Sequence, residues 1–141
     1  MCCVKLAVRT GRLNLIVIYR PPKYTLFFDD FKIMLDEVAA LSGGLIVCGD
    51  FSCPSSTVGH ADKLLERIVD DYDLVQHVNV PTNRHDGILD LFITSPEKPT
   101  IADVVIEDMG FPNHFMVKAA LSDAIHARLH LTLSRNIKPW T

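Results

Sequence analysis

The chain has 141 residues, the size of one domain, and a composition of 48% hydrophobic and 22% charged residues. This balance excludes extensive disorder and favours strands buried on both faces. The formal net charge of −3 excludes the broad basic surface that sequence-independent DNA binding needs. A nucleic-acid partner stays open, however, because a metal ion held by carboxylates would supply positive charge.

Strand patterns open the chain. Residues 4–8 predict a short strand, and residues 13–19 are nearly all apolar, as in a strand buried on both faces. Pro21 and Pro22 end this strand, because proline cannot donate to a sheet ladder. Apolar spacing then predicts a helix over 27–41, with acidic residues 29 and 30 in its first turn and glycines 43 and 44 at its end.

The remainder of the pattern is richer in strands. It predicts a short buried strand over 45–48, an amphipathic helix over 61–72, a loop around 81–87, and strands over 88–94, 101–106 and 115–121. Strands that alternate with helices and then follow one another indicate a layered α/β protein. Residues 1–121 form the expected domain, and the weakly patterned residues 122–141 are expected to be a linker or tail.

The cysteines and the N-terminus bear on the compartment. Four cysteines lie at positions 2, 3, 48 and 53. Their spacing resembles neither a disulfide framework nor a Cys-x-x-Cys metal knuckle. No signal-peptide pattern opens the chain, and no apolar run approaches the roughly 18 residues of a membrane span. We therefore expect a soluble, intracellular protein with reduced, structural thiols and no membrane partner.

Three polar residues stand where apolar strands begin or end. Asp50 follows a buried strand and so faces the crevice where α/β sheets bind ligands, although a turn-capping aspartate would look alike. Asp90 lies among apolar residues and needs a partner if buried, unless it faces water on an edge strand. His114 opens the last strand and suits that partnership, since one imidazole nitrogen would stay available for a reacting group. A lone histidine is more often structural, so His114 gains its weight from the two aspartates.

Other candidate groups carry weaker signals. Ser52, Asp90 and His114 follow the order of an α/β-hydrolase triad, but Ser52 lacks the flanking glycines of a nucleophile elbow. The other histidines lack the spacing of a zinc site and are expected on the surface or in loops. They are His60, His77, His85, His126 and His130.

Four motifs occur in the order seen in the endonuclease/exonuclease/phosphatase superfamily. They are Tyr19-Arg20-Pro21-Pro22, Gly49-Asp50-Phe51-Ser52, Leu89-Asp90-Leu91-Phe92-Ile93-Thr94 and Pro112-Asn113-His114. Residues 4–121 resemble in particular the endonuclease domain of non-LTR (LINE-type) retrotransposons, where the tyrosine motif often reads Tyr-Arg-Pro-Pro. The resemblance implies a four-layer α/β sandwich that cuts DNA phosphodiesters with Mg²⁺ or Mn²⁺, of which this chain holds the second half.

The resemblance also implies a role for each matching residue. Tyr19 would help to hold the scissile phosphate, and Asp50 would orient or deprotonate the attacking water. Asp90 would fix and polarise His114, which would contact the phosphate and stabilise its developing charge. Ser52 would face the substrate, at the end of the aspartate motif.

The chain departs from the family pattern in ways that weaken the expected site. Ser52 stands where the family usually has asparagine, and a hydroxyl lacks the two donors of an amide. Asn113 replaces an aspartate associated with metal binding, so any metal contribution there is weakened. The metal-holding glutamate of the family belongs to the missing first half. We therefore expect weak metal binding and impaired DNA cleavage.

Two alternatives to the retrotransposon endonuclease remain. One is a catalytically dead binding or interaction fragment, which would self-associate through an unpaired sheet surface. The other is a phosphoesterase that acts on small molecules, which the tyrosine motif at residues 19–22 disfavours.

Overall fold

The computed structural model describes residues 2–8, 11–21, 24–52, 63–97 and 101–122. Its helices are α1 (Phe27–Ala39) and α2 (Lys63–Asp71). Its strands are β1 (Cys2–Val8), β2 (Gly11–Tyr19), β3 (Gly44–Asp50), β4 (Val75–Gln76), β5 (Asp90–Thr94), β6 (Ile101–Glu107) and β7 (Met116–Leu121). The predicted α/β class is confirmed.

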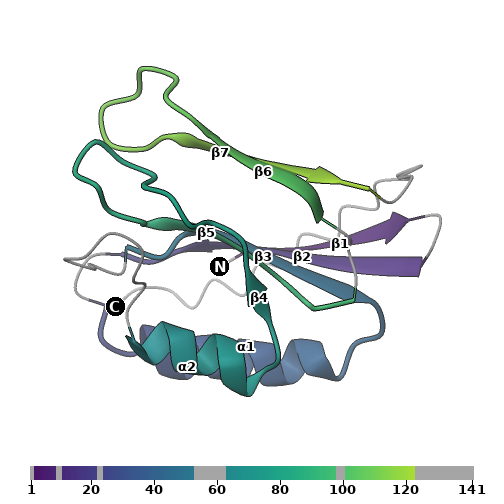
Figure 1. Cartoon of the computed structure of the whole chain (residues 1–141). Helices are drawn as coiled ribbons and strands as arrows, with labels where there is room; N and C mark the ends of the chain where they lie inside the picture. The colour runs from purple at the N-terminus through teal and green to yellow at the C-terminus, as the bar shows by residue number, and fades with distance from the viewer. Residues whose placement is uncertain (1, 9–10, 22–23, 53–62, 98–100, 123–141) are drawn as a thin grey trace.

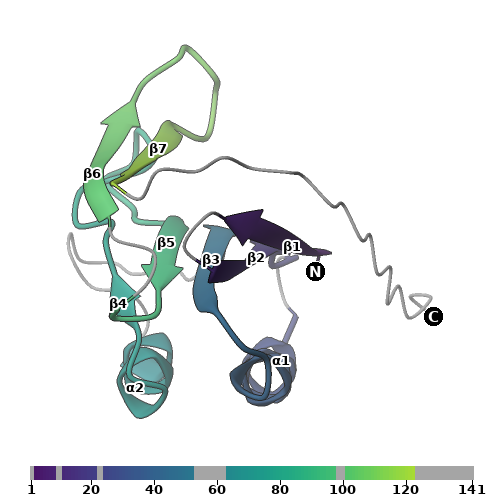
Figure 2. The same cartoon turned by 90° about the vertical axis from the view of Figure 1, so that its right-hand side faces the viewer.

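The strands form two sheets. The larger has the order β1-β2-β3-β5-β4 and is mixed, because β2 and β3 run parallel while the other neighbours are antiparallel. Strands β6 and β7 pair antiparallel as a second sheet. Both helices cover one face of the larger sheet, and β6–β7 lies on its other face (Figures 1 and 2). The described residues thus form three layers, and the four-layer sandwich stays a prediction.

The helix-facing side of the larger sheet holds most of the core. Phe27 and Phe31 of α1 lie 5.8 Å and 5.6 Å, centroid to centroid, from the ring of Phe51, with the rings edge to face. Such aromatic pairs stabilise a core by about 0.5–1.5 kcal/mol beyond the area that they bury. Phe51 is fully buried and directly follows Asp50, so this aromatic cluster fixes the end of β3.

The other face of β2 is more open than the sequence predicted. Val17 is 41% exposed and Tyr19 is 63% exposed, so burial of this strand on both faces is wrong. Among the described residues, the small second sheet lies over β5, which contacts β7, and does not extend over β2 (Figure 2). An apolar sequence run therefore marks a strand here, but it does not say how much of each face is covered.

Several boundaries differ from those predicted. Helix α1 ends at Ala39, before the glycines expected at its end. Gly43 instead allows a close backbone approach, because a Cβ atom there would lie 2.2 Å from the Arg12 carbonyl oxygen. Strand β5 starts at Asp90, and β4 was not predicted, since two residues carry too little periodicity. Residues 61–62 of the predicted second helix and 123–141 of the tail lie outside the described residues.

No helix within the described ranges is long and apolar enough to cross a membrane.

Candidate functional site

The two aspartates lie face to face across neighbouring strands. Asp50 ends β3 and Asp90 opens β5, and the antiparallel register makes them direct partners. Gly49 has φ +130°, and a Cβ atom there would lie 2.0 Å from the Ile18 carbonyl oxygen. The absence of a side chain at Gly49 thus lets the β2 backbone approach closely.

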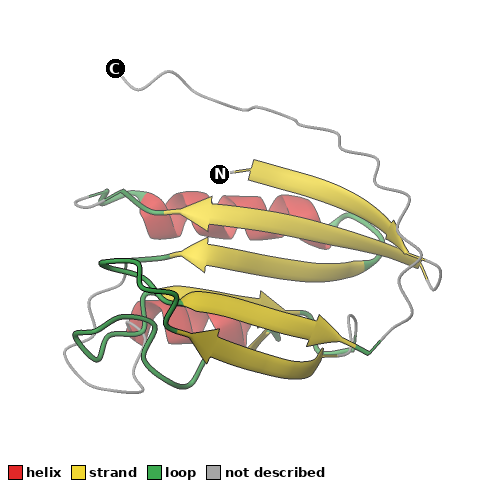
Figure 3. Cartoon of the chain, turned by 90° about the horizontal axis from the view of Figure 1, so that it is seen from above, coloured by secondary structure: helices red, strands yellow, loops and turns green. Residues whose placement is uncertain are grey.

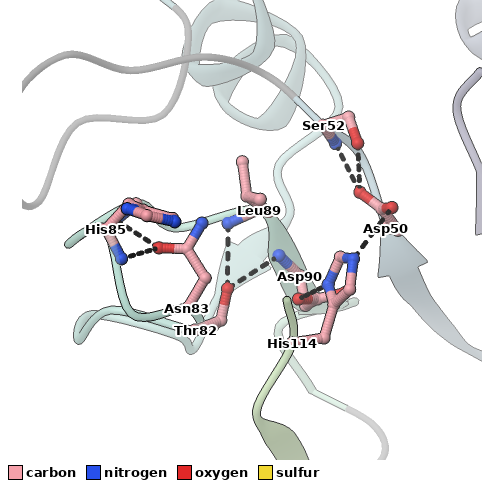
Figure 4. A network of polar contacts seen from close by, with 9 residues as sticks. Asp50, Ser52, Thr82, Asn83, His85, Leu89, Asp90 and His114 are labelled. Carbon is pink, nitrogen blue, oxygen red and sulfur yellow. Dashed lines mark hydrogen bonds and ion pairs between the residues drawn. The ribbon is translucent and has the colours of Figure 1, made fainter. Parts of the chain in front are cut away.

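His114 joins the two carboxylates. Its Nδ1 lies 2.9 Å from Asp90 Oδ2, and its Nε2 lies 3.8 Å from Asp50 Oδ2 (Figure 4). The aspartate side chains are 18% and 17% exposed, whereas the imidazole is 43% exposed and open to a ligand. Asp90 is therefore a half-buried carboxylate with a histidine partner, as predicted, and the alternative of a water-facing edge residue is wrong.

Burial and pairing set the charges of this cluster. Burial raises the pKa of Asp90, and Asp50 adds to the rise, while the hydrogen bond and charge of His114 oppose it. The hydrogen bond to Asp90 raises the pKa of His114, and the charge of Asp50 does so too. The site thus holds two carboxylates whose repulsion is relieved by a cation, either the imidazolium or a bound metal ion.

Thr82 is a site residue that the sequence did not reveal. It is fully buried, and its Oγ1 accepts hydrogen bonds from the backbone N–H groups of Leu89 (3.0 Å) and Asp90 (3.2 Å). Its carbonyl oxygen accepts a third hydrogen bond, 2.7 Å long, from the N–H of Phe115. Thr82 therefore holds the backbone at Asp90 and next to His114 at once (Figure 4). Its only sequence signal is a threonine after a proline in a polar loop.

The loop that carries Thr82 is closed by its own side chains. Asn83 Oδ1 accepts hydrogen bonds from the N–H groups of His85 and Gly87, each 2.9 Å long (Figure 4). The Thr82 N–H donates to the Gly87 carbonyl oxygen at 2.9 Å. These bonds fix the chain just before β5, where a displaced backbone would move the Asp90 carboxylate.

The other predicted site residues surround this cluster in different ways. Tyr19 is the β-sheet partner of Asp50 and is 63% exposed, so its ring is available to a ligand. Ser52 turns its Oγ back on Asp50 and donates to Oδ1 at 2.6 Å, with its N–H donating to the same oxygen at 2.8 Å. Asn113 is exposed beside His114, and its weakened metal role stays a prediction.

The geometry does not support the α/β-hydrolase alternative. Ser52 donates to Asp50, and His114 Nε2 faces Asp50 as well, so the Ser52 hydroxyl is not aligned on the imidazole. The serine also has φ +40°, an uncommon value for a residue other than glycine or asparagine. An asparagine at this position would adopt this backbone conformation more readily.

Cys48, His77 and His85 do not belong to the cluster, and the side chains of Cys2 and Cys3 lie outside the described residues. Cys48 is a half-buried free thiol, and burial raises its pKa, which fits an inert core residue. His85 is an exposed loop residue, as expected, but His77 is half-buried, because the unpredicted strand β4 carries the chain against β5. Residues outside the described ranges are Cys53, His60, His126 and His130.

The donor set fits a divalent cation. One ligand atom each from Asp50, Asp90 and His114 lies within 4.8 Å of the others. Carboxylate oxygens suit hard cations such as Mg²⁺ and Mn²⁺, and a histidine nitrogen adds affinity for transition metals. Among the described residues this is the one group of histidine, cysteine and acidic side chains arranged in this way. It is a candidate metal centre at the joined ends of β3 and β5.

Comparison with known proteins adds no family assignment: no protein-family model and no curated protein matches the chain.

Proposed function

We propose that the protein hydrolyses phosphodiesters with a divalent cation, and that its substrate is DNA. The observation that carries the proposal is the pairing of Asp90 with His114 Nδ1, which turns the second imidazole nitrogen toward Asp50 Oδ2, 3.8 Å away, on the exposed side of the cluster. Support also comes from the four sequence motifs, which resemble those of the endonuclease/exonuclease/phosphatase superfamily. The resemblance to non-LTR retrotransposon endonucleases makes cleavage of a DNA target the more specific form of the proposal.

In this mechanism the carboxylates of Asp50 and Asp90 would hold a Mg²⁺ or Mn²⁺ ion, which would supply Lewis-acid polarisation of a phosphate oxygen and a lower pKa of bound water, effects of several kcal/mol. Asp50 orients the attacking water or accepts its proton. Asp90 holds His114 through Nδ1, so the opposite nitrogen donates to the phosphate oxygen on which charge develops. Tyr19, the exposed strand partner of Asp50, contacts the same phosphate.

The activity is expected to be weak. Ser52 replaces a side chain that would offer two amide donors, and its hydroxyl is already engaged by Asp50. Asn113 brings a neutral amide where the family has a carboxylate. Both differences reduce the interactions that hold the metal ion and the phosphate, so we expect slow cleavage rather than the rate of an intact endonuclease.

Plasmid nicking by the purified chain tests the proposal. We expect slow nicking of supercoiled DNA with Mg²⁺ or Mn²⁺, no nicking with EDTA, and loss of nicking in His114→Ala. His77→Ala is the matched control, because His77 hydrogen-bonds Thr94 at the opposite end of β5. A wild-type chain that nicks with neither metal ion, or an equal rate in His114→Ala, contradicts the proposal. Cleavage of bis(p-nitrophenyl) phosphate without plasmid nicking would favour the small-molecule phosphoesterase instead.

A second candidate, a binding or interaction fragment, is favoured by one observation. The face of β2 that carries Val17 and Tyr19 is open, and an exposed apolar sheet face promotes self-association. Sedimentation velocity over a range of concentrations tests this candidate. If the chain is an interaction fragment, it forms a dimer that Val17→Lys dissociates. A chain that stays monomeric at all concentrations excludes this candidate.

A further inference from the structure

The loop between β6 and β7 carries exposed apolar side chains beside the site. All of residues 108–113 are exposed, with Met109 at 51% and Phe111 at 59%. The loop protrudes beyond both sheets at the same end of the molecule as loop 82–87 (Figures 1 and 3). Single exposed apolar residues are common on protein surfaces. Here, however, Met109 and Phe111 flank Gly110, and Phe111 lies three residues before His114.

Hydrogen bonds tie this loop to the loop that positions Asp90. Asp108 Oδ1 accepts from the Gly110 N–H at 2.8 Å, and the Asp108 carboxylate accepts from Arg84 Nη2 at 3.3 Å and 3.2 Å. Arg84 lies in loop 82–87. Gly110 has φ +82°, so the chain turns sharply between Met109 and Phe111. The apolar tip is therefore attached to the same framework as the catalytic groups.

The tip lies within reach of a nucleotide bound at the site. Phe111 precedes His114 by three residues, so their Cα atoms are at most about 11 Å apart even in an extended chain. Successive bases of a DNA strand are about 3.4 Å apart along the helix axis, so this distance spans only a few nucleotides. A phosphate held by His114 would thus place neighbouring bases near the Phe111 ring.

The charges around the site make a stacking contact valuable. Two cations on the neighbouring surface are already paired, Arg84 with Asp108 and Lys118 with Glu107. Phosphate contacts from these side chains would compete with their carboxylate partners. A base stacked on an aromatic ring does not require positive charge, and every base has a π-face. An exposed phenylalanine on an anchored loop fits this kind of recognition.

We propose that Phe111 stacks on an unpaired base next to the cleaved phosphodiester, with Met109 as an apolar flank. Single-stranded or mismatched DNA is then preferred over a fully paired duplex, because a paired base must leave its stack before it reaches the ring. This inference rests on the proposed function for the position of the phosphate, and it names the class of substrate.

The test measures binding and cleavage separately on the full chain. Binding of a single-stranded oligonucleotide containing 2-aminopurine is followed by fluorescence in EDTA, and nicking is followed with Mn²⁺. We expect Phe111→Ala to bind about ten-fold more weakly, as loss of one stacked base does, and Phe111→Trp to retain binding. Phe111→Leu keeps an apolar side chain but lacks the ring, so it should bind almost as weakly as Phe111→Ala. The matched control is Ile33→Ala, which removes a 58% exposed apolar side chain from α1, on the opposite face of the sheet.

The outcomes separate this inference from the proposed function. If the wild type nicks DNA and Phe111→Ala binds the oligonucleotide as tightly as the wild type does, the stacking role is overturned and the nuclease proposal stands. If the wild type binds the oligonucleotide more tightly than Phe111→Ala does but never nicks DNA, the stacking role stands and the nuclease proposal is overturned. Equal affinity of the wild type for single-stranded and fully paired DNA also overturns the stacking role.

Discussion

The two ends of the β3–β5 strand pair have opposite chemistry. At one end Asp50 faces Asp90 beside His114, and at the other Ile46 faces Thr94 beside His77. The carboxylate partner raises the pKa of His114. Burial lowers the pKa of His77, whose Nε2 lies 2.8 Å from the hydroxyl oxygen of Thr94. The partner and the burial of an imidazole therefore set its charge, and only the aspartate end can attract a cation.

The two ends also differ in backbone strain. At the aspartate end a non-glycine residue, Ser52, has a positive φ of +40°, whereas at the opposite end the positive φ of +111° belongs to Gly43. The opposite end is closed by ordinary hydrogen bonds, in which the Leu45 N–H donates to Ser95 Oγ at 2.9 Å and the Ser95 N–H donates to the Leu45 carbonyl oxygen at 3.1 Å. Strained conformations cluster at functional sites and persist because the surrounding core holds them. One end of the strand pair thus stabilises the fold, while the other holds the candidate metal site.

The largest expected effect comes from Asp90→Asn. Loss of the carboxylate removes the group that orients and charges His114, so cleavage should fall by about 10²–10⁴-fold. Thr94→Ser, at the opposite end of β5, should leave the cleavage rate unchanged because it keeps the hydroxyl that His77 meets. Initial rates of plasmid nicking measure both. An equal loss in the two variants would show that the ends do not differ in function.

The stability of metal-free Asp90→Asn should change in the opposite direction to its activity. Burial raises the pKa of Asp90, so the folded state disfavours the charged carboxylate. The free energy of unfolding of the protein therefore falls as pH rises through the folded-state pKa of Asp90. The asparagine variant should therefore be more resistant than the wild type to guanidinium unfolding at about pH 8, and the gain should vanish in acid, where Asp90 is protonated in both states. A less stable variant at pH 8 contradicts this assignment.

Thr82→Val should have the next largest effect. It leaves the buried N–H groups of Leu89 and Asp90 without their acceptor, which costs about 1–3 kcal/mol of unfolding free energy for each unsatisfied group. Cleavage should fall as well, because the backbone at Asp90 loses its anchor, while the Phe115 N–H keeps its bond to the Thr82 carbonyl oxygen. Thr82→Ser keeps the oxygen and should recover most of both losses. Denaturant titration and nicking rates measure them, and a Val variant with wild-type values refutes the anchoring role.

The two histidines should titrate on opposite sides of their ordinary pKa of 6.5 in the metal-free protein. His114, with a raised pKa, contributes stability below pH 6.5 that is lost as pH rises through its folded-state pKa. His77, with a lowered pKa, contributes stability above 6.5 that is lost as pH falls through its folded-state pKa. NMR titration of the ring protons measures the two midpoints. Midpoints in the reverse order would contradict the contrast between the two ends.

Ser52→Asn should produce the smallest change. Asparagine tolerates positive φ better than serine does, so the unfolding free energy should rise by up to about 1 kcal/mol. The amide also offers two donors near the phosphate site, and nicking should become faster. Ser122→Asn, at an exposed position after β7, is the control. Lower stability together with slower nicking would show that Ser52 is adapted to this site.

The sequence predicts those parts of the site that depend on local context. Asp50 and Asp90 stand out because one follows an apolar strand and the other lies among apolar residues, and His114 suits the partnership because it opens a strand. Thr82 could not be predicted, since its role depends on three backbone groups that only the folded loop brings together. The open face of β2 was also missed, because an apolar run does not record how far a second sheet extends over it.

Mn²⁺ titration followed by NMR tests most directly whether Asp50, Asp90 and His114 form a metal centre. Paramagnetic broadening acts only near the bound ion, so the account predicts that the His114 ring signals disappear first while those of His77 persist. In Asp50→Asn, broadening of His114 should require more Mn²⁺. Uniform broadening of both histidines, or a sharp His114 signal in the presence of excess Mn²⁺, would contradict the account.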